Sequence, residues 1–303
     1  MNPHISVLLL ESIENLNIKE DGIYVDCTLG SAGHSSQILK RIKRGKLFAF
    51  DQDGEAIKYS NKILESISNN YEIINSNFVN LRDELHKRGI KKVDGILFDL
   101  GVSSYQLDEA ERGFSYHKDA SLDMRMNQNQ KLSAYNVVNE YSVDDLIRIF
   151  YEYGEEKYSK SIASAIVKNR PINTTLELAE IIKNSVPEKY RRNSHPARKV
   201  FQAIRIEVND ELNVFEKALN DSIELLNEGG RLCVITFHSL EDRICKTTFK
   251  KLSEVNEIYK GTPNIPDEYK PKIKIIKKIK PSKEELDNNN RSRSAILRVI
   301  EKM

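Results

Sequence analysis

Three carboxylates follow short apolar runs in the first hundred residues: Asp26 after IYV, Asp51 after KLFAF and Asp99 after VDGILF. In an open α/β sheet, ligands bind beyond the carboxyl ends of the strands, which is where these acids would lie. A carboxylate there can accept hydrogen bonds from the two hydroxyls of a ribose, or hold an exocyclic amine. The pattern therefore predicts a nucleotide-sized crevice with three acidic groups on its rim.

The loop after the first run has the sequence GSAG (residues 30–33), and a helical pattern opens at His34. Glycines let a backbone approach a ligand closely, and a helix start offers unpaired N–H groups. The loop matches neither GxGxxG nor GxxxxGK[ST], which disfavours a nicotinamide dehydrogenase and a P-loop NTPase. It favours S-adenosylmethionine, which has no pyrophosphate and whose ammonium needs an acceptor. A strand–turn–helix without any ligand is the alternative, because short motifs also match by chance.

Other polar and aromatic residues near this loop have two interpretations each. An aspartate at such a position commonly caps a helix or turn. The carboxylate of Asp99 can also lie beside a methyl donor. Phe78 is as suited to the core as to stacking on adenine. His34 fits helix-start packing as well as ligand binding, and we interpret His238 as a structural hydrogen-bonding group. The histidines lack metal-ligand spacing, so no metal site is predicted.

Strand and helix patterns alternate through the first hundred residues, which predicts a doubly wound α/β sheet. The run VDGILFDL is apolar on both faces, as a buried parallel strand should be. The strands are expected at residues 23–25, 45–51, 71–78 and 93–100, and the helices at 4–16, 35–42, 53–64 and 81–88.

The alternation stops after residue 100. Residues 101–130 have no clear period, and a loop of that length is usually functional. Four helices follow, at 142–153, 158–168, 175–184 and 195–206. A further helix at 210–226 and strands at 231–237, 272–279 and 294–300 then complete a seven-stranded sheet, with the last two as an antiparallel C-terminal pair and polar, mobile linkers at 261–271 and 280–291.

The composition limits partners and location. Lys and Arg number 47 against 45 Asp and Glu, so no global field attracts nucleic acid. Three scattered cysteines make neither a disulfide frame nor a CxxC site. The N-terminus is not a secretory signal, and no apolar stretch is long enough for a membrane span. We expect a cytoplasmic protein without a membrane partner; a homodimer is compatible with the sequence but not indicated by it.

Residues 183–205 form a basic segment with seven Lys and Arg against one acid, Glu188, and with interleaved Tyr190 and Phe201. Such a segment suits phosphate contacts and base stacking on RNA, although charge runs are more often a solvated helix face. Its place in an insertion favours RNA. We expect RNA contacts from Arg191, Arg192, Arg198 and Lys199.

The chain therefore divides into three predicted segments. Residues 1–106 are the first part of the sheet domain, and residues 207–303 are its second part. Residues 107–206 are a loop plus helical insertion that recognises an RNA substrate.

Several segments together resemble the 16S ribosomal RNA (cytosine N4)-methyltransferases of bacteria. The resemblance covers residues 4–299, its segments follow one another in order, and several are long, so the resemblance is specific. The segments are GIYVDCTLGSAGHS, FAFDQD, GILFDLGVSSYQLDEAERGFS, SLDMRM, HPARKVFQAIRIEVNDEL, GGRLCVITFHSLEDR and RSRSAILRV.

The resemblance implies a class I S-adenosylmethionine-dependent methyltransferase fold, α/β and Rossmann-like, with an all-helical inserted domain. It also implies methylation of the exocyclic amine of a cytidine in the decoding region of 16S rRNA, which we expect to be the partner within the small ribosomal subunit. Carried over motif by motif, the cofactor contacts are Ala32, Gly33, His34, Asp51, Phe78, Asp99 and Gln106.

The chain departs from the family pattern at two positions. Ala32 stands in place of the middle glycine of G-x-G-G-H, and Tyr105 stands where proline is usual. Because a Cβ disfavours the left-handed region, we expect Ala32 to keep φ below zero. Neither change removes a charged or donor group, so we expect activity to be retained.

For the chemistry we expect Asp99, or carbonyls of residues 101–103, to accept the amine hydrogens of the target cytosine and aim its lone pair. The base must leave its stack to reach the pocket. Loop 101–130 is expected to close over it, with candidate contacts from Arg112, Phe114, Asp123 and Arg125.

Two other functions remain open. A DNA amino-methyltransferase would share the pocket but more often has a D/N-P-P-Y/F/W motif, where this chain has DLGVSS, so DNA is not expected. A non-catalytic RNA-binding factor of ribosome assembly would need the basic segment but not the cofactor crevice.

Overall fold

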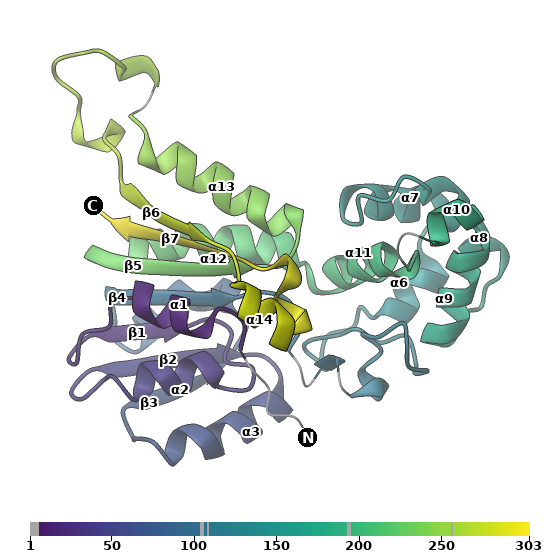
Figure 1. Ribbon diagram of the computed structural model, residues 1–303, viewed down its shortest axis with the longest axis horizontal. Coiled ribbons are helices and arrows are strands. Elements are labelled where there is room, and N and C mark those ends of the chain that lie inside the picture. The colour runs from purple at the N-terminus through teal and green to yellow at the C-terminus, as the bar shows by residue number, and fades with distance from the viewer. Residues whose placement is uncertain (1–5, 104–105, 108, 193–194, 256) are drawn as a thin grey trace. The chain divides into compact units, whose positions relative to one another are not determined.

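The computed structural model describes residues 6–103, 106–107, 109–192, 195–255 and 257–303. A seven-stranded sheet has the strand order β3-β2-β1-β4-β5-β7-β6 (Figure 1). Strands β1 to β5 are parallel to one another, whereas β7 is antiparallel to both β5 and β6. The strands are β1 (Ile23–Asp26), β2 (Lys46–Asp51), β3 (Tyr71–Asn75), β4 (Val93–Asp99), β5 (Leu226–Thr236), β6 (Ile273–Ile279) and β7 (Ile296–Lys302). The predicted doubly wound sheet with an antiparallel C-terminal pair is confirmed.

Helices cover both faces of the sheet (Figure 1). Successive residues of a strand point to opposite faces, so Phe98 and Leu97 of β4 enter different cores. On one face Phe98 packs with Phe215 at a ring-centroid distance of 5.8 Å. The first face carries α4 (Leu81–Lys87), α12 (Glu211–Leu225) and α13 (Ser239–Ser253), and the second carries α1 (Leu9–Asn15), α2 (Gly33–Leu39) and α3 (Gly54–Glu65).

The chain forms two compact units. One comprises residues 1–101 and 213–303, and the other comprises residues 102–212. The second unit has its own core of aliphatic and aromatic side chains. Its helices are α6 (Ala134–Glu140), α7 (Val143–Glu152), α8 (Ser159–Lys168), α9 (Thr175–Asn184), α10 (Glu188–Arg191) and α11 (Ala197–Asn209).

Side-chain caps account for several helix starts. Asp53 accepts from the backbone N–H of Glu55 at the start of α3. Thr174 and Glu177 form a reciprocal capping box at the start of α9, which satisfies two backbone N–H groups that would otherwise lack partners. These local signals explain why the helix boundaries were largely predictable from the sequence.

The structure differs from the predicted elements in several places, and β5, for example, begins at Leu226 and not at residue 231. Strand β3 ends at Asn75, and Phe78 instead opens a 3₁₀ turn, because Asn77 accepts from the N–H of Val79. Helices α6 and α10 are additional. The stretch 280–291, expected as a linker, contains helix α14 (Lys283–Asn288), whose Glu285 accepts from the N–H of Leu8 at 2.8 Å.

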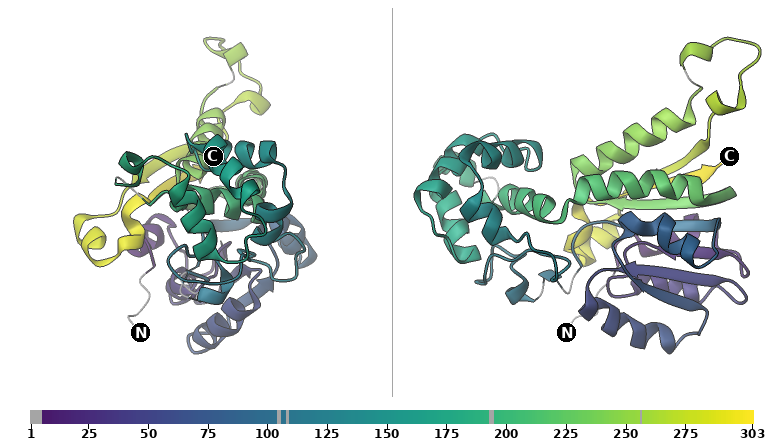
Figure 2. Two further views of the ribbon diagram at one scale, coloured as in Figure 1. Left: turned by 90° about the vertical axis from the view of Figure 1, so that its right-hand side faces the viewer. Right: turned by 180° about the vertical axis from the view of Figure 1, so that it is seen from behind.

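The segment 257–270 between α13 and β6 runs away from the sheet (Figure 2). Strand β6 lies at the sheet edge, and its lysines Lys274, Lys277 and Lys278 are exposed, as predicted for an edge strand. The three cysteines are buried free thiols. Among the described residues, no helix combines the length and apolarity needed to cross a membrane.

Candidate active site

The strand order reverses between β1 and β4, so the crevice at their carboxyl ends is the switch point of the sheet. Asp26 ends β1 and Asp99 ends β4. Asp51 ends β2, the next strand outward. The three acids predicted on one rim therefore follow three adjacent strands.

The loop between β1 and α2 links these strand ends through Thr28. Its hydroxyl donates to Asp26 Oδ1 at 3.3 Å and accepts from the backbone N–H of Asp99 at 2.7 Å. Further along the same loop, the N–H of Gly30 donates to Asp51 Oδ2 at 2.9 Å. One short loop therefore fixes all three strand ends relative to one another.

Asp26 supports this loop from inside the protein. Its side chain is fully buried, and Oδ1 accepts from the N–H of Thr28 at 3.0 Å. Oδ2 accepts from the hydroxyl of Ser35, on α2, at 2.7 Å. Burial raises the pKa of Asp26, whereas the hydrogen bonds from Ser35 and Thr28 oppose that rise. Asp26 is thus a support of the crevice and not a surface ligand.

Asp51 is placed to grip a diol. Each of its oxygens already accepts one backbone N–H, from Gly30 at 2.9 Å and from Asp53 at 2.9 Å. A carboxylate oxygen has two acceptor sites, so each oxygen keeps one for a hydroxyl group. Burial raises the pKa of Asp51 to about 6, against the effect of these N–H groups.

Asp99 has a buried oxygen without a partner. Oδ1 is inaccessible to solvent and has no hydrogen-bond partner among the described residues. Oδ2 lies 3.6 Å from Nδ1 of His34, and the side chain as a whole is 24% exposed. Burial, and then the charges of Asp26 and Glu241, raise the pKa of Asp99 well above its usual value. A buried acceptor costs free energy until a donor reaches it, so this oxygen is suited to bind an N–H group.

These features fit S-adenosylmethionine, the cofactor predicted from the sequence. Asp51 supplies acceptors for a ribose diol, and the turn that starts at Gly30 allows close approach of a ligand. The unpartnered Asp99 oxygen suits an amine. A Cβ at the nearby Gly33 would lie 1.9 Å from the hydroxyl oxygen of Ser6, so a larger residue there would require the Ser6 side chain to move.

The expectation that Ala32 keeps a negative φ is wrong. Ala32 adopts the left-handed conformation, with φ of 62° and ψ of 20°, immediately before α2. The turn requires this conformation because the N–H of Ala32 donates to the carbonyl of Leu29, while its own carbonyl accepts from Ser36. The methyl group is fully buried, so packing partly offsets the backbone strain.

We expect Ala32→Gly to raise the free energy of unfolding by about 0.5 kcal/mol, because about 1–2 kcal/mol of left-handed strain outweighs about 0.8 kcal/mol for the lost methyl. Ala32→Val should instead destabilise the protein, because a branched side chain tolerates positive φ poorly. Urea unfolding of both variants measures the difference. A loss of about 1 kcal/mol or more in Ala32→Gly would show that the strain estimate is mistaken.

Phe78 is half-buried and packs edge-on against Phe98 with ring centroids 5.5 Å apart. It therefore joins the core at one side, and its contact with adenine stays a prediction. Gln106 belongs to the helical unit, where its side-chain oxygen accepts from the N–H of Ser103 at 3.1 Å. The second departure from the family pattern, Tyr105, lies outside the described residues.

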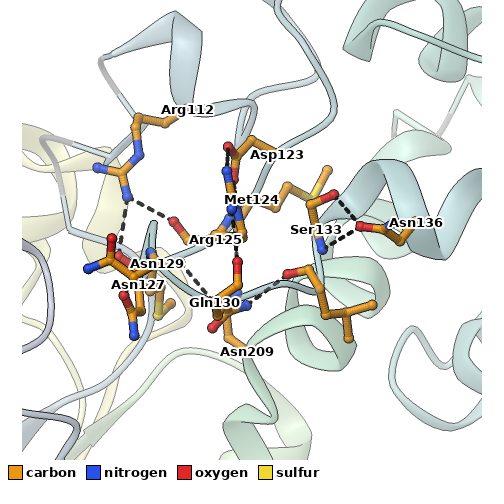
Figure 3. A network of polar contacts seen from close by, with 12 residues as sticks. Arg112, Asp123, Met124, Arg125, Asn127, Asn129, Gln130, Ser133, Asn136 and Asn209 are labelled. Carbon is orange, nitrogen blue, oxygen red and sulfur yellow. Dashed lines mark hydrogen bonds and ion pairs between the residues drawn. The ribbon is translucent and has the colours of Figure 1, made fainter.

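Loop 101–130 was expected to present four side chains to a target base, but two of them are buried in the helical unit. Phe114 is in the core of that unit. Arg112 is 7% exposed, and its Nη2 donates to the carbonyls of Arg125 at 2.8 Å and Met126 at 3.3 Å (Figure 3). This placement contradicts a surface role for Arg112 on RNA.

The other two side chains pair with each other. Arg125 Nε and Nη2 donate to the two oxygens of Asp123 at 2.9 and 2.8 Å, and Nη1 donates to the carbonyl of Gln130 at 2.8 Å (Figure 3). The side-chain amide of Asn209 donates to the carbonyl of Met124 and accepts from the backbone N–H of Met126. Both Arg125 and Asp123 thus hold the loop in shape, so the expected RNA contact of Arg125 lacks a free guanidinium.

The four remaining predicted RNA contacts lie on or beside α10 and α11. Arg192 and Arg198 are exposed, with Arg192 paired to Glu188 at 2.6 Å. Lys199 Nζ donates to the carbonyl of Glu155 at 2.8 Å. Within the part of the chain that the structure describes, Arg191 donates through Nε alone, to the carbonyl of Val186 at 3.1 Å.

His238 is the N-terminal cap of α13 and forms a capping box with Glu241. This position agrees with the prediction that His238 is a structural hydrogen-bonding group. The sequence analysis missed Thr28 and Ser35, which connect Asp26 to Asp99 and to α2. The signal was present, because both hydroxyls follow the acid at the end of a strand, where a local hydrogen bond is common.

The whole chain matches both a family model and a known protein. The model of the MraW methylase family matches residues 1–303. A protein of Exiguobacterium sibiricum named ribosomal RNA small subunit methyltransferase H is 57% identical over 309 residues, which cover 100% of this chain and 99% of that protein.

Two solved structures show a more distant likeness. An rRNA methylase from Streptococcus thermophilus is 12% identical with a TM-score of 0.45, covering 97% of this chain and 93% of that one. TrmN from Thermus thermophilus is 10% identical with a TM-score of 0.44, covering 98% of this chain and 48% of that one. These likenesses are too distant to place any residue.

Proposed function

The chain belongs to the MraW methylase family, and from this membership we propose that it transfers a methyl group from S-adenosylmethionine to N4 of a cytidine in the decoding region of 16S rRNA. A relative of 57% identity is named for methylation of the ribosomal small-subunit RNA, which supports this substrate. The observation that carries the chemistry is Asp99 Oδ1 at the switch point, a buried acceptor to which none of the described residues donates. The exocyclic amine of cytosine is a donor of the kind that it lacks.

S-adenosylmethionine supplies the electrophilic methyl group. The cytosine amine is a weak nucleophile because its lone pair is delocalised into the ring. We propose that Asp99 accepts an amine hydrogen and so aims the lone pair. Burial raises the pKa of Asp99, but the positive charge of a bound sulfonium would favour its ionised form, in which the negative charge stabilises the positive charge that develops on nitrogen. The amine then loses a proton to the carboxylate or to water. Asp51 would hold the ribose of the bound cofactor, and Thr28 keeps Asp99 in register with the loop.

We propose that the helical unit recognises the RNA through exposed and half-buried cations on or beside α10 and α11. The retained contacts are Arg191, Arg192, Arg198 and Lys199. Arg112 and Arg125 are better explained as supports of the loop. The substrate in the cell would be the small ribosomal subunit in the cytoplasm.

The function is tested by supplying S-adenosylmethionine with a labelled methyl group to unmethylated small subunits, to naked 16S rRNA and to DNA. Nucleoside analysis should find N4-methylcytidine in the ribosomal RNA only. Label on another base, or on DNA, contradicts the proposed specificity. Heat released on binding the cofactor separates an enzyme from the alternative of a non-catalytic RNA-binding factor, which would give none.

Cofactor affinity should depend on pH through Asp51. Its raised pKa means that the free protein takes up a proton as the pH falls through about 6, and a protonated carboxyl accepts the ribose hydroxyls poorly. We therefore expect the Kd for S-adenosylmethionine to rise as the pH is lowered from 7.5 to 5. Calorimetry across this range measures the effect. Asp51→Asn should bind more weakly at pH 7.5 and lose the step near pH 6; a step unchanged in this variant would assign it to another group.

A further inference from the structure

The helical unit contains a groove to which the proposed function assigns no ligand, although one of its lining residues, Arg191, is among the proposed RNA contacts. Its volume is about 540 Å³, within the range of small-ligand sites. It lies entirely within residues 102–212, between α9 on one side and Arg191, His195 and Pro196 on the other. The lining residues are Tyr116, Leu176, Ala179, Glu180, Lys183, Arg191, His195 and Pro196.

One wall of the groove is aromatic. The rings of Tyr116 and His195 stack with centroids 4.7 Å apart and an interplanar angle of 24°. Phe201 packs edge-on against Tyr116 with ring centroids 5.6 Å apart, which helps to hold the tyrosine ring in place. Burial, and then the charges of His117 and Lys183, lower the pKa of His195, so near neutral pH its ring is an uncharged stacking surface.

The groove is also lined by two cationic side chains, those of Arg191 and Lys183. Arg191 donates only Nε to the carbonyl of Val186, so the outer nitrogens of its guanidinium lack a partner among the described residues. Lys183 is exposed and pairs with Glu180 at 3.1 Å. Arg191 and Lys183 against Glu180 leave a net positive charge in the groove.

Helix α10, which carries Arg191, is anchored by a buried acid. Glu156 is fully buried and accepts from the hydroxyl of Tyr190 at 2.6 Å and from the N–H of Tyr158 at 2.9 Å. The two tyrosine rings meet with centroids 4.9 Å apart. The position of Arg191 is therefore set before any ligand arrives, which reduces the entropy cost of binding.

We propose that this groove is a second RNA subsite, which binds one nucleotide of a single-stranded segment away from the methylated base. The base stacks on the pair formed by Tyr116 and His195, and its phosphate binds Arg191 and Lys183. Stacking together with charge is how proteins hold single-stranded RNA without strict sequence preference. That the ligand is RNA rests on the proposed function; the stacking and charge are properties of the groove itself.

The test measures the affinity of the full chain for a fluorescent single-stranded RNA oligonucleotide of mixed sequence by anisotropy, with no methyl transfer required. His195→Ala and Arg191→Ala should each weaken binding about tenfold. Arg191→Ala should also reduce the slope of log affinity against log salt by about one. Lys160→Ala, which removes an exposed lysine of α8 outside the groove, should change neither.

Glu180→Gln separates this site from a merely structural role. It removes the acid of the groove, so it should tighten oligonucleotide binding about two- to threefold, which a damaged fold would not do. Tyr116→Phe should keep wild-type affinity because the stacking ring is retained. If His195→Ala, Arg191→Ala and Glu180→Gln all bind RNA as the wild type does, the subsite is overturned.

The outcome is distinguishable from a failure of the proposed function. Methyl transfer to 16S rRNA with no effect of the groove variants on RNA affinity would retain the function and remove the subsite. Groove-dependent RNA binding without methyl transfer would retain the subsite and remove the function.

Discussion

Asp99→Asn is expected to lower kcat for methyl transfer by at least about 10²-fold at saturating S-adenosylmethionine. The amide keeps the volume of the side chain and one acceptor oxygen. It loses the negative charge that would stabilise the cationic nitrogen as the new bond forms, and its NH₂ group can repel the amine hydrogens. The effect should be on kcat, which single-turnover assays with small subunits measure directly.

The matched control is Asp94→Asn, a second acid on the same strand. Asp94 lies at the opposite end of β4, where Oδ2 accepts from the N–H of Ile23 at 2.9 Å. An asparagine there can still accept that hydrogen bond, so turnover should stay close to the wild type. Near-normal turnover of Asp99→Asn and of Asp99→Ala would remove Asp99 from the mechanism.

Asp26→Ala is expected to reduce the free energy of unfolding by about 3–4 kcal/mol. The substitution removes a fully buried acceptor and leaves the hydroxyl of Ser35 and both donors of Thr28 without it. Because the position is fully buried, a water molecule could replace the carboxylate only if the surrounding side chains rearranged. Chemical denaturation, with far-UV circular dichroism as the signal, measures the loss.

Asp26→Asn provides the comparison. It keeps the shape and one acceptor oxygen for Thr28, so its cost should be well below that of Asp26→Ala. Because Thr28 also accepts from the backbone N–H of Asp99, both variants should weaken cofactor binding in the order of their instability. Equal stability of Asp26→Ala and the wild type would mean that the loop does not depend on this acid.

The strand ends were predictable because they follow from local pattern. Asp51 and Asp99 terminate apolar runs, and a doubly wound topology brings such ends together. The conformation of Ala32 was not predictable from residue type, because alanine ordinarily avoids positive φ. The turn between Leu29 and Ser36 imposes that conformation through backbone hydrogen bonds, and these depend on the strand and helix that it joins.

The roles of Arg112 and Arg125 show a second limit. In the sequence both are simply cations in an aperiodic loop next to an expected RNA site. Their partners are backbone carbonyls and Asp123, which only the folded path of the loop brings within reach. The difference between an arginine that binds RNA and one that holds a loop lies in its neighbours, which sequence spacing does not specify.

Lys274, Lys277 and Lys278 on the outermost strand have a consequence for self-association. The main-chain groups of β6 that face outward would accept another strand, and a second copy of this protein would offer an identical one. If the β6 strands of two copies paired edge to edge, their lysines would come close together. The electrostatic cost of this pairing rises as salt is removed. Growth of the sheet from this strand of one molecule into the next is therefore opposed by electrostatic repulsion.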